Sequence, residues 1–570
     1  MAGAPTTVKD LDFSVSSPLY PSPLDWRDQF IYFLLVDRFD NNTAAIPAYS
    51  PDSTATGRDA GQGAIFQGGN LQGIIRRLDY IQGLGCNTLW LSPIFKNRQD
   101  QTDSYHGYGI QNFLDIDPRF GTLDDLRELV AKAHAHGMYV IQDIILNHTG
   151  DVWRYPEGHR YFYFEGQRFD FGVWREADVT PDLQSDDGVW PVELQRADNF
   201  KRMGEIRDWN NLQEARDGDF LSLKELDLAR PHVLDTLIKA YKYWIRNVDI
   251  DGFRIDTVKH MEVSATAVFC NAIREYAQRV GKHNFFLFGE IVADDALIQQ
   301  YIGRNSRIEN SNERFPSLDA ALDFPLYFVL EETIKGDLNP AVLRHRYDAF
   351  RDYYADHGAA GRYFVTFVDN HDQMSRPYRR FLHHSANPLQ AILAIGYLLT
   401  SQGVPCIYYG TEQGFDGGGD NDRYVRECMF GGRWGAFNTT GVHFFDPAHP
   451  LYQGIRAIAR LRQQQPALRY GRQYFREISG NGTDFGFPLD GHCTLAYSRI
   501  LDSEEVLVVL NLDSQPRADH ITVDRNLSAP GQQMLHLLSS GGRLQVRESG
   551  GRACVQVALP AYGLAILACG

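Results

Sequence analysis

Short apolar and β-branched runs alternate along the chain with longer segments whose apolar residues recur at helical spacing. Such runs, bounded by polar residues, are typical of buried strands. The helix-period segments include Leu71–Leu84, Leu123–His136, Val233–Asn247, Val263–Val280 and Pro388–Thr400. The predicted strands are Ile31–Val36, Thr88–Ser92, Met138–Ile145, Ile250–Asp256, Phe285–Glu290, Leu318–Phe324, Tyr363–Val368 and Val404–Tyr409. Eight β–α alternations predict an α/β protein with a closed (β/α)8 TIM barrel. An open doubly wound sheet is less consistent, because no GxGxxG motif follows an early strand.

Two stretches break the alternation. Residues 149–225, after the third strand, are rich in aromatics and are too long for a simple loop, so we predict a small inserted domain. Residues 448–570 contain one helix, Leu451–Gln464, followed by short alternating strands, which predict a C-terminal antiparallel β-sandwich. The barrel then comprises residues 1–148 and 226–447.

Composition and charge narrow the classes of function. The chain has 570 residues, 43% hydrophobic and 22% charged, which is typical of a globular enzyme and excludes fibrous and membrane-spanning classes. A formal charge of −16 is unfavourable for binding nucleic acid or anionic lipid surfaces. The seven cysteines form no CxxC metal pair and are too few for a disulfide framework. The N-terminal residues do not resemble a signal peptide, so a cytoplasmic location is the default expectation; a mature secreted form would look the same.

Ionisable residues cluster where the predicted strands end, and in a parallel barrel these ends form the active site. The clusters are Asp143, Asn147 and His148 after the third strand; Arg254, Asp256, Lys259 and His260 after the fourth; Glu290 after the fifth; and Asn370, His371 and Asp372 after the seventh. Such a concentration at one mouth predicts acid–base chemistry there.

Two of these carboxyl groups have different expected environments. Arg254 and Asp256 are two residues apart on a strand, so their side chains point to the same face. We expect the guanidinium to lower the pKa of Asp256 and keep it ionised, which suits a nucleophile. The alternative is that the two residues form a purely structural ion pair. Glu290 follows apolar residues and a glycine, so burial is expected to raise its pKa, as a general acid requires. With Asp372 nearby, three carboxyl groups would suit an oxocarbenium-like transition state, as in glycoside hydrolysis.

The motifs DIILNH, GFRIDTVKH, FGE and FVDNHD, in this order, resemble the four signature regions of the α-amylase family of glycoside hydrolases and transglycosylases. The similarity extends to Gly68–Ile94, Ser104–Ile110 and Leu223–Asp227. The resemblance implies a retaining mechanism with Asp256 as nucleophile, Glu290 as acid/base and Asp372 as transition-state stabiliser. It also implies that Tyr108, His148, Arg254, Lys259, His260, His371, Asp422 and Arg426 bind substrate. For Tyr108, stacking on a sugar ring competes with simple core packing, and Asp420 competes with Asp422 as the partner of Arg426.

The resemblance implies an α-glucan substrate with α-1,4 bonds, either maltooligosaccharides or starch. Many relatives carry a tryptophan after His-Gly-Tyr where this chain has Gly109, so short oligosaccharides are at least as consistent as long chains. A 4-α-glucanotransferase or cyclodextrin-forming enzyme is the main alternative, and a non-catalytic carbohydrate-binding protein is a remote one. No organic cofactor, nucleic acid or membrane partner is expected.

The resemblance further implies a structural calcium ion between barrel and insertion. Its ligands would be the Asn147 side chain, the Glu225 carboxylate and the His260 backbone carbonyl, consistent with calcium's preference for oxygen. One more acidic ligand would come from Asp182, Asp186, Asp187 or Asp198. The alternative is that Asn147 hydrogen-bonds to protein groups with no metal.

Overall fold

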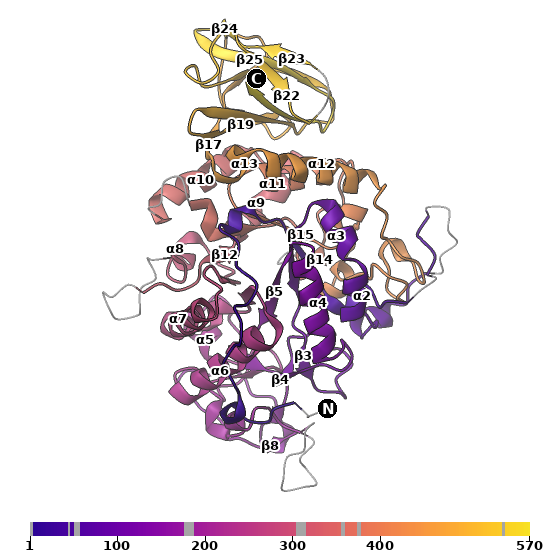
Figure 1. Cartoon of the computed structure of the whole chain (residues 1–570), viewed down its shortest axis with the longest axis vertical. Coiled ribbons are helices and arrows are strands. Elements are labelled where there is room, and N and C mark those ends of the chain that lie inside the picture. Colours follow the sequence, from indigo (N-terminus) through magenta and orange to yellow (C-terminus); the bar gives the residue numbers. More distant parts are fainter. Residues whose placement is uncertain are drawn as a thin grey trace.

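The computed structural model describes residues 4–43, 46–50, 57–175, 187–303, 315–354, 360–372, 378–538 and 542–569. Within these residues eight parallel strands close a barrel in the order β1-β2-β5-β10-β11-β12-β13-β15, and β15 pairs again with β1. Figure 1 shows helices around this barrel and a separate sheet region at one end of the molecule. The predicted (β/α)8 barrel is confirmed.

The barrel strands are short and almost completely buried, which explains their uninterrupted apolar sequences. Their register places Ile31 of β1 opposite Thr88 on one side and Cys406 on the other. The strands are β1 (Ile31–Leu34), β2 (Thr88–Leu91), β5 (Tyr139–Ile144), β10 (Gly252–Ile255), β11 (Phe286–Gly289), β12 (Ala320–Leu322), β13 (Phe364–Thr366) and β15 (Val404–Tyr408).

The helices cover the outside of the barrel. An apolar stripe on one of them, α6, packs Leu237, Tyr241 and Trp244 inward, and this helix begins with Pro231 in its first turn. The helices of this layer are α1 (Val36–Phe39), α2 (Leu71–Arg76), α3 (Leu78–Leu84), α4 (Leu123–Ala135), α6 (Pro231–Val248), α7 (Val263–Arg279), α8 (Asp295–Ile298), α9 (Phe324–Lys335), α10 (Ala341–Tyr354) and α11 (Gln390–Thr400).

The segment Leu71–Leu84, expected as one helix, is divided into α2 and α3 at Arg77. The Arg77 Nε atom donates to Asp40 Oδ2 at 2.5 Å, and its guanidinium lies 3.8 Å from the centre of the Phe445 ring. The break therefore coincides with tertiary contacts of Arg77. No glycine or proline marks it in the sequence, so the apolar pattern alone indicates one continuous helix.

The insertion leaves and rejoins the barrel through two short paired strands. In β6 (His148–Thr149) and β9 (Lys224–Glu225), His148 lies opposite Glu225 in an antiparallel pair. Inside the insertion, β7 (Trp153–Arg154) pairs with β8 (Val173–Trp174), and α5 spans Leu212–Asp217. The Trp153 ring packs against Tyr155 and Phe200, so part of the aromatic content forms a local core. β3 (Phe95–Asn97) pairs with β4 (Ile110–Ile116) beside the barrel.

After α12 (Pro450–Gln464) and α13 (Pro466–Tyr470), the described part of the C-terminal region forms two antiparallel sheets, as expected for a sandwich. Buried residues such as Leu507, Val555 and Leu567 pack between them. One sheet contains β17 (Arg472–Phe475), β19 (Thr494–Leu501), β20 (Glu504–Asn511), β26 (Leu564–Cys569), β22 (Gln533–His536) and β23 (Arg543–Gln545). The other contains β18 (Ile478–Ser479), β21 (Arg517–Thr522), β25 (Arg552–Leu559) and β24 (Arg547–Ser549).

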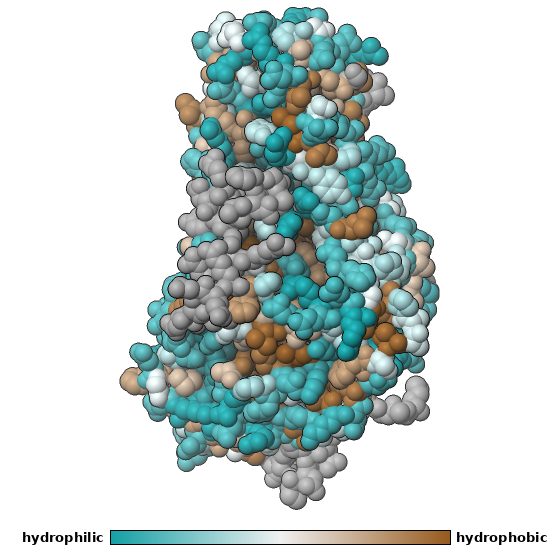
Figure 2. All heavy atoms as spheres, turned by 60° about the vertical axis from the view of Figure 1, so that its left-hand side comes forward, coloured by the Kyte–Doolittle hydropathy of each residue, from teal (hydrophilic) through white to brown (hydrophobic). Residues whose placement is uncertain are grey.

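The face in Figure 2 is mostly hydrophilic, with small apolar groups scattered over it. In the described parts of the chain, every helix is too short or too polar to cross a bilayer. All seven cysteines are unpaired thiols.

Candidate active site

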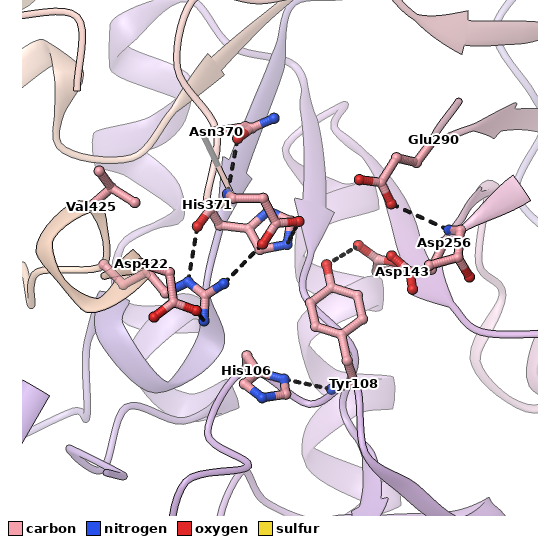
Figure 3. A network of polar contacts seen from close by, with 12 residues as sticks. His106, Tyr108, Asp143, Asp256, Glu290, Asn370, His371, Asp422 and Val425 are labelled. Atoms are coloured by element: carbon pink, nitrogen blue, oxygen red, sulfur yellow. Dashed lines mark hydrogen bonds and ion pairs between the residues drawn. The ribbon is translucent and has the colours of Figure 1, made fainter. Parts of the chain in front are cut away.

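The predicted catalytic residues lie just beyond the carboxyl ends of barrel strands. Asp256 directly follows β10 and Glu290 directly follows β11, while Asp372 lies in the loop after β13. Figure 3 shows Asp256, Glu290 and Asp143 on one side of Tyr108, with His371 and Asp422 on the other. Because parallel strands end at one rim, side chains from distant parts of the sequence face one another.

The Arg254 guanidinium connects the carboxyl groups on one side of this site. Its Nη1 atom lies 2.6 Å from Asp256 Oδ1 and 2.8 Å from Asp143 Oδ1, and its Nη2 atom lies 2.8 Å from Glu290 Oε2. Asp143 also accepts hydrogen bonds from Trp90 Nε1 at 3.1 Å and from the Tyr108 hydroxyl at 2.9 Å. Arg254 and Asp143 have no exposed side-chain surface, so this arrangement is rigidly held.

Arg254 lowers the pKa of Asp256, as expected, but burial outweighs this effect. Burial raises this pKa to about 6; the guanidinium offsets only part of the rise, and repulsion from Asp143 adds to it. Sequence neighbours reveal the attractive charge but not the depth of burial. Asp256 is nevertheless mainly ionised at neutral pH.

Glu290 follows the direction expected from its sequence environment. Burial raises its pKa to about 8, with Asp256 and Asp372 adding to the rise and Arg254 opposing it. The backbone N–H of Thr257 donates to its Oε2 atom at 3.3 Å. At neutral pH the site therefore holds one mainly protonated carboxyl group beside one mainly ionised group.

Asp372 is held by a second arginine. Arg426 Nη2 donates to Asp372 Oδ1 at 2.9 Å, its Nη1 atom lies 2.9 Å from Asp422 Oδ2, and its Nε atom donates to the His371 carbonyl at 2.9 Å. Asp420 instead lies 3.9 Å from Arg423. The pair with Arg426 is thus formed by Asp422, which begins the 3₁₀ turn η12 (Asp422–Val425).

Aromatic and imidazole rings lie between the two arginine clusters. The Tyr108 ring is parallel to that of His371, with centres 5.3 Å apart, and only 8% of Tyr108 is exposed. Burial lowers the pKa of His148 to about 3, and also places that of His371 well below its ordinary value. Both imidazoles are therefore neutral near pH 7, a state in which they can bind sugar hydroxyl groups.

Lys259 and His260 face the insertion. Lys259 Nζ donates to the Trp209 carbonyl at 3.2 Å, and His260 Nδ1 lies 2.6 Å from the Ala215 carbonyl. Both residues belong to the 3₁₀ turn η8 (Val258–His260) that follows Asp256. The Trp209 indole beside them is 38% exposed. The structure thus places this pair at the edge of the site where barrel and insertion meet.

Gly109 is closely surrounded. A Cβ atom on Gly109 would lie 2.9 Å from Asn97 Oδ1 and 3.1 Å from Ser104 Oγ. A side chain at this position would require the neighbouring chain to move. The absence of an aromatic group at Gly109 therefore fits the local packing.

The predicted calcium ligands meet, but a cationic side chain lies among them. Asn147 Nδ2 donates to Glu225 Oε2 at 2.6 Å, and Lys201 Nζ lies 3.8 Å from Glu225 Oε1 and donates to the Arg216 carbonyl at 2.5 Å. Among the described residues no group of three or more His, Cys, Asp or Glu side chains could hold a metal. Asp182 and Asp186 lie outside the described residues, and Asp198 pairs with Arg202. This arrangement does not fit a calcium ion.

The sequence places Asp143 at the barrel mouth without a role, and it does not indicate Trp90 or Tyr105 as site residues. Asp143 was visible at the end of the third strand, but its contact with Arg254 depends on the β5–β10 register, which places the two residues side by side. The Tyr105 hydroxyl lies 3.2 Å from Arg426 Nη1. Its only sequence signal is its place in the motif that contains Tyr108.

The family model "Alpha amylase, catalytic domain" matches residues 33–468. The chain belongs to the alpha-amylase family. An alpha-amylase of Streptomyces lividans is 32% identical to it over 563 residues, covering 90% of this chain and 57% of that relative.

Solved structures support the same family. An alpha-amylase from Geobacillus thermoleovorans, complexed with acarbose, is 26% identical with a TM-score of 0.69 and covers 96% of this chain and 99% of its own. A cyclomaltodextrin glucanotransferase with a three-domain ABC distribution is 25% identical, also with a TM-score of 0.69, and covers 95% and 99%. The similar structures thus include both alpha-amylases and a cyclomaltodextrin glucanotransferase.

Proposed function

We propose that this chain is a retaining glycoside hydrolase that cleaves α-1,4-glucosidic bonds in maltooligosaccharides or starch. The chain spans little more than half of the Streptomyces relative, so this activity is inferred from the site itself. The observation that carries the proposal is the position of Arg254 between Asp256 and Glu290. Arg254 contacts both the ionised Asp256 carboxylate and the protonated Glu290 carboxyl group at one rim of the barrel. Double displacement requires one carboxyl group in each of these states.

The proposed reaction has two steps. Glu290 donates its proton to the glycosidic oxygen as the C1–O bond breaks, and the Asp256 carboxylate forms a covalent bond to C1. Glu290, now ionised, then removes a proton from water, whose oxygen attacks C1 and releases Asp256. Asp372, held by Arg426, supplies negative charge where the sugar becomes oxocarbenium-like.

The remaining side chains are proposed to hold the sugar. Neutral His148 and His371 would bind hydroxyl groups of the ring whose bond is cleaved, and Tyr108 would offer its ring edge or face. Lys259 would contact the leaving-group side. The packed surroundings of Gly109 remove one stacking surface, which favours maltooligosaccharides over long chains.

Transglycosylation is the second candidate function. The Trp209 indole, whose centre lies 6.0 Å from that of the His260 ring, belongs to a residue that is 38% exposed. It would offer an apolar surface to an acceptor, and such a surface favours a sugar over water. The same two-step reaction then ends with attack by a sugar hydroxyl. Its products would include 4-α-glucan chains or cyclodextrins.

Product analysis tests both candidates. Proton NMR during hydrolysis of pure maltotetraose should first show the α-anomer, because two inversions at C1 retain configuration. Early β-anomer would contradict the proposed mechanism. Chromatography of the same mixture separates the candidates: oligomers longer than maltotetraose indicate transfer, whereas shorter sugars alone indicate hydrolysis.

A further inference from the structure

We propose that the Lys201 ammonium group is a built-in cation that cross-links α5 and β9 within the insertion, beside its junction with the barrel, at the position where the family resemblance implies calcium. The inference concerns how the fold is held together and stands independently of the proposed activity. Its basis is the set of oxygen atoms around Lys201 Nζ.

These oxygens come from three points of the returning chain. Lys201 Nζ donates to the Arg216 carbonyl at 2.5 Å and lies 3.6 Å from Asp217 Oδ1 and 3.8 Å from Glu225 Oε1. An ammonium group has three donors and no acceptor, which matches this all-oxygen surrounding. The Arg216 carbonyl is in the last turn of α5, where carbonyls lack intrahelical partners.

The backbone also fixes the direction of this side chain. The Lys201 N–H donates to the Glu225 carbonyl at 3.1 Å, so the two residues lie side by side. Only 13% of the Lys201 side chain is exposed, and Glu225 is almost completely buried. The ammonium group is therefore enclosed between α5 and β9, unlike the freely solvated end of a surface lysine.

The same contacts oppose a calcium ion. Calcium takes about six to eight oxygen ligands, and an ammonium group beside Glu225 and Asp217 would repel a divalent cation at close range. Asn147 turns its amide NH2 toward Glu225, whereas a calcium ligand would offer its oxygen. The Asn147 Oδ1 and Glu225 Oε1 atoms are both buried without a hydrogen-bond partner among the described residues. Lys201 Nζ supplies positive charge beside Glu225 Oε1, at 3.8 Å, and Asn147 Oδ1 is the oxygen that the ammonium group does not account for.

The location gives this cation a clear structural role. Glu225 pairs with His148 across β9 and β6, and Asn147 directly precedes His148. Ala215, next to Arg216, holds the His260 ring. Lys201 thus joins α5 and β9 at the point where both ends of the insertion contact the barrel.

The test compares thermal melting and metal content of the full chain. The wild-type protein should contain no stoichiometric calcium after dialysis, and its Tm should be the same with chelator and with millimolar calcium. Lys201→Met should lower Tm by several degrees. Lys239→Met, which removes an exposed lysine paired with Asp235 on α6, is the matched control and should leave Tm unchanged.

Calcium should also raise the Tm of Lys201→Met more than that of the wild type, because the variant frees the oxygen-lined position. About one calcium per wild-type chain, with a Tm lowered by chelator, would overturn the proposal, and these wild-type measurements do not depend on the variant folding. A Lys201→Met protein that melts like the wild type would also overturn it. An equal rise in Tm with calcium in the wild type and in Lys201→Met, or no rise in either protein, would also overturn the proposal.

Discussion

Glu290 is the residue whose environment most directly sets the proposed chemistry, because burial keeps it protonated near neutral pH. We expect Glu290→Gln to lower kcat on maltooligosaccharides by roughly 100- to 10,000-fold, since an amide cannot donate the proton. With an aryl maltoside whose leaving group needs no protonation, formation of the intermediate should be much less affected. Steady-state kinetics on both substrates measure this difference.

Asp256→Asn is the matched comparison for Glu290→Gln. Loss of the nucleophile should reduce turnover by several orders of magnitude on both substrates, because no leaving group can replace the covalent step. If Glu290→Gln retained near-wild-type activity on maltooligosaccharides, the acid/base assignment would be wrong.

The two carboxyl groups also predict a pH dependence. Activity requires ionised Asp256 and protonated Glu290, so kcat/KM should fall below about pH 6, as Asp256 is protonated, and above about pH 8, as Glu290 ionises. A pH profile on maltotetraose should therefore be bell-shaped. In Glu290→Gln, assayed with the aryl substrate, kcat/KM should no longer fall at high pH but should still fall at low pH. If the fall at high pH persisted unchanged in this variant, it would be caused by the ionisation of another group.

At the scale of single elements, α4 shows how local sequence fixes a helix end. Thr122 and Asp125 form a capping box, in which the Thr122 N–H donates to Asp125 Oδ2 at 2.8 Å and the Asp125 N–H donates to Thr122 Oγ1 at 3.2 Å. Thr122→Ala should destabilise the barrel by about 1 kcal/mol and lower Tm slightly. Thr122→Ser keeps the hydroxyl and should melt close to the wild type, and equal melting of the two variants would argue against the cap.

Much of the element order could be predicted because barrel strands buried on both faces leave continuous apolar runs in the sequence. The ordered motifs likewise predict that Asp256, Glu290 and Asp372 meet at one rim of the barrel. Two features escaped prediction for physical reasons. The break at Arg77 depends on contacts with Asp40 and Phe445. The ammonium group of Lys201 depends on a fold that brings it to Glu225 from 24 positions away, where no motif marks it.

Across the whole molecule, buried arginines attach the C-terminal sheets to the barrel. Arg499 on β19 donates to the carbonyls of Thr400, Leu468 and Gly471, and it is completely buried. Burial lowers its pKa to about 10, so it is still charged at neutral pH. Its carbonyl partners belong to α11 and to the segment after α12, which places this contact at the junction.

Arg499→Met should leave these carbonyls unsatisfied, at a cost of about 1–3 kcal/mol. We expect a lower Tm and faster proteolysis near residues 465–471, with kcat on maltotetraose unchanged because the active site is at the strand rim. Arg525→Met, which removes an exposed pair with Glu548, should change neither property. A large loss of kcat in Arg499→Met would show that the junction between the C-terminal sheets and the barrel affects the active site.

The paired strands β6 and β9 have a consequence for cooperativity. They are two residues long, yet they close a loop that contains the whole insertion, and the hydrogen-bonded ladder of the barrel does not pass through that loop. Further backbone hydrogen bonds join the insertion to β4 beside the barrel, from the Gly150 N–H to the Ile110 carbonyl and from the Trp190 N–H to the Gln111 carbonyl, both at 2.8 Å. All of these contacts lie outside the closed ladder of the barrel, so the insertion can open as its own unfolding unit while the barrel stays intact. Amide protons in residues 149–175 and 187–225 should then exchange faster than those of the barrel strands. His148, on the boundary between the two units, belongs both to the proposed sugar-binding rim and to the strand pair that closes the insertion.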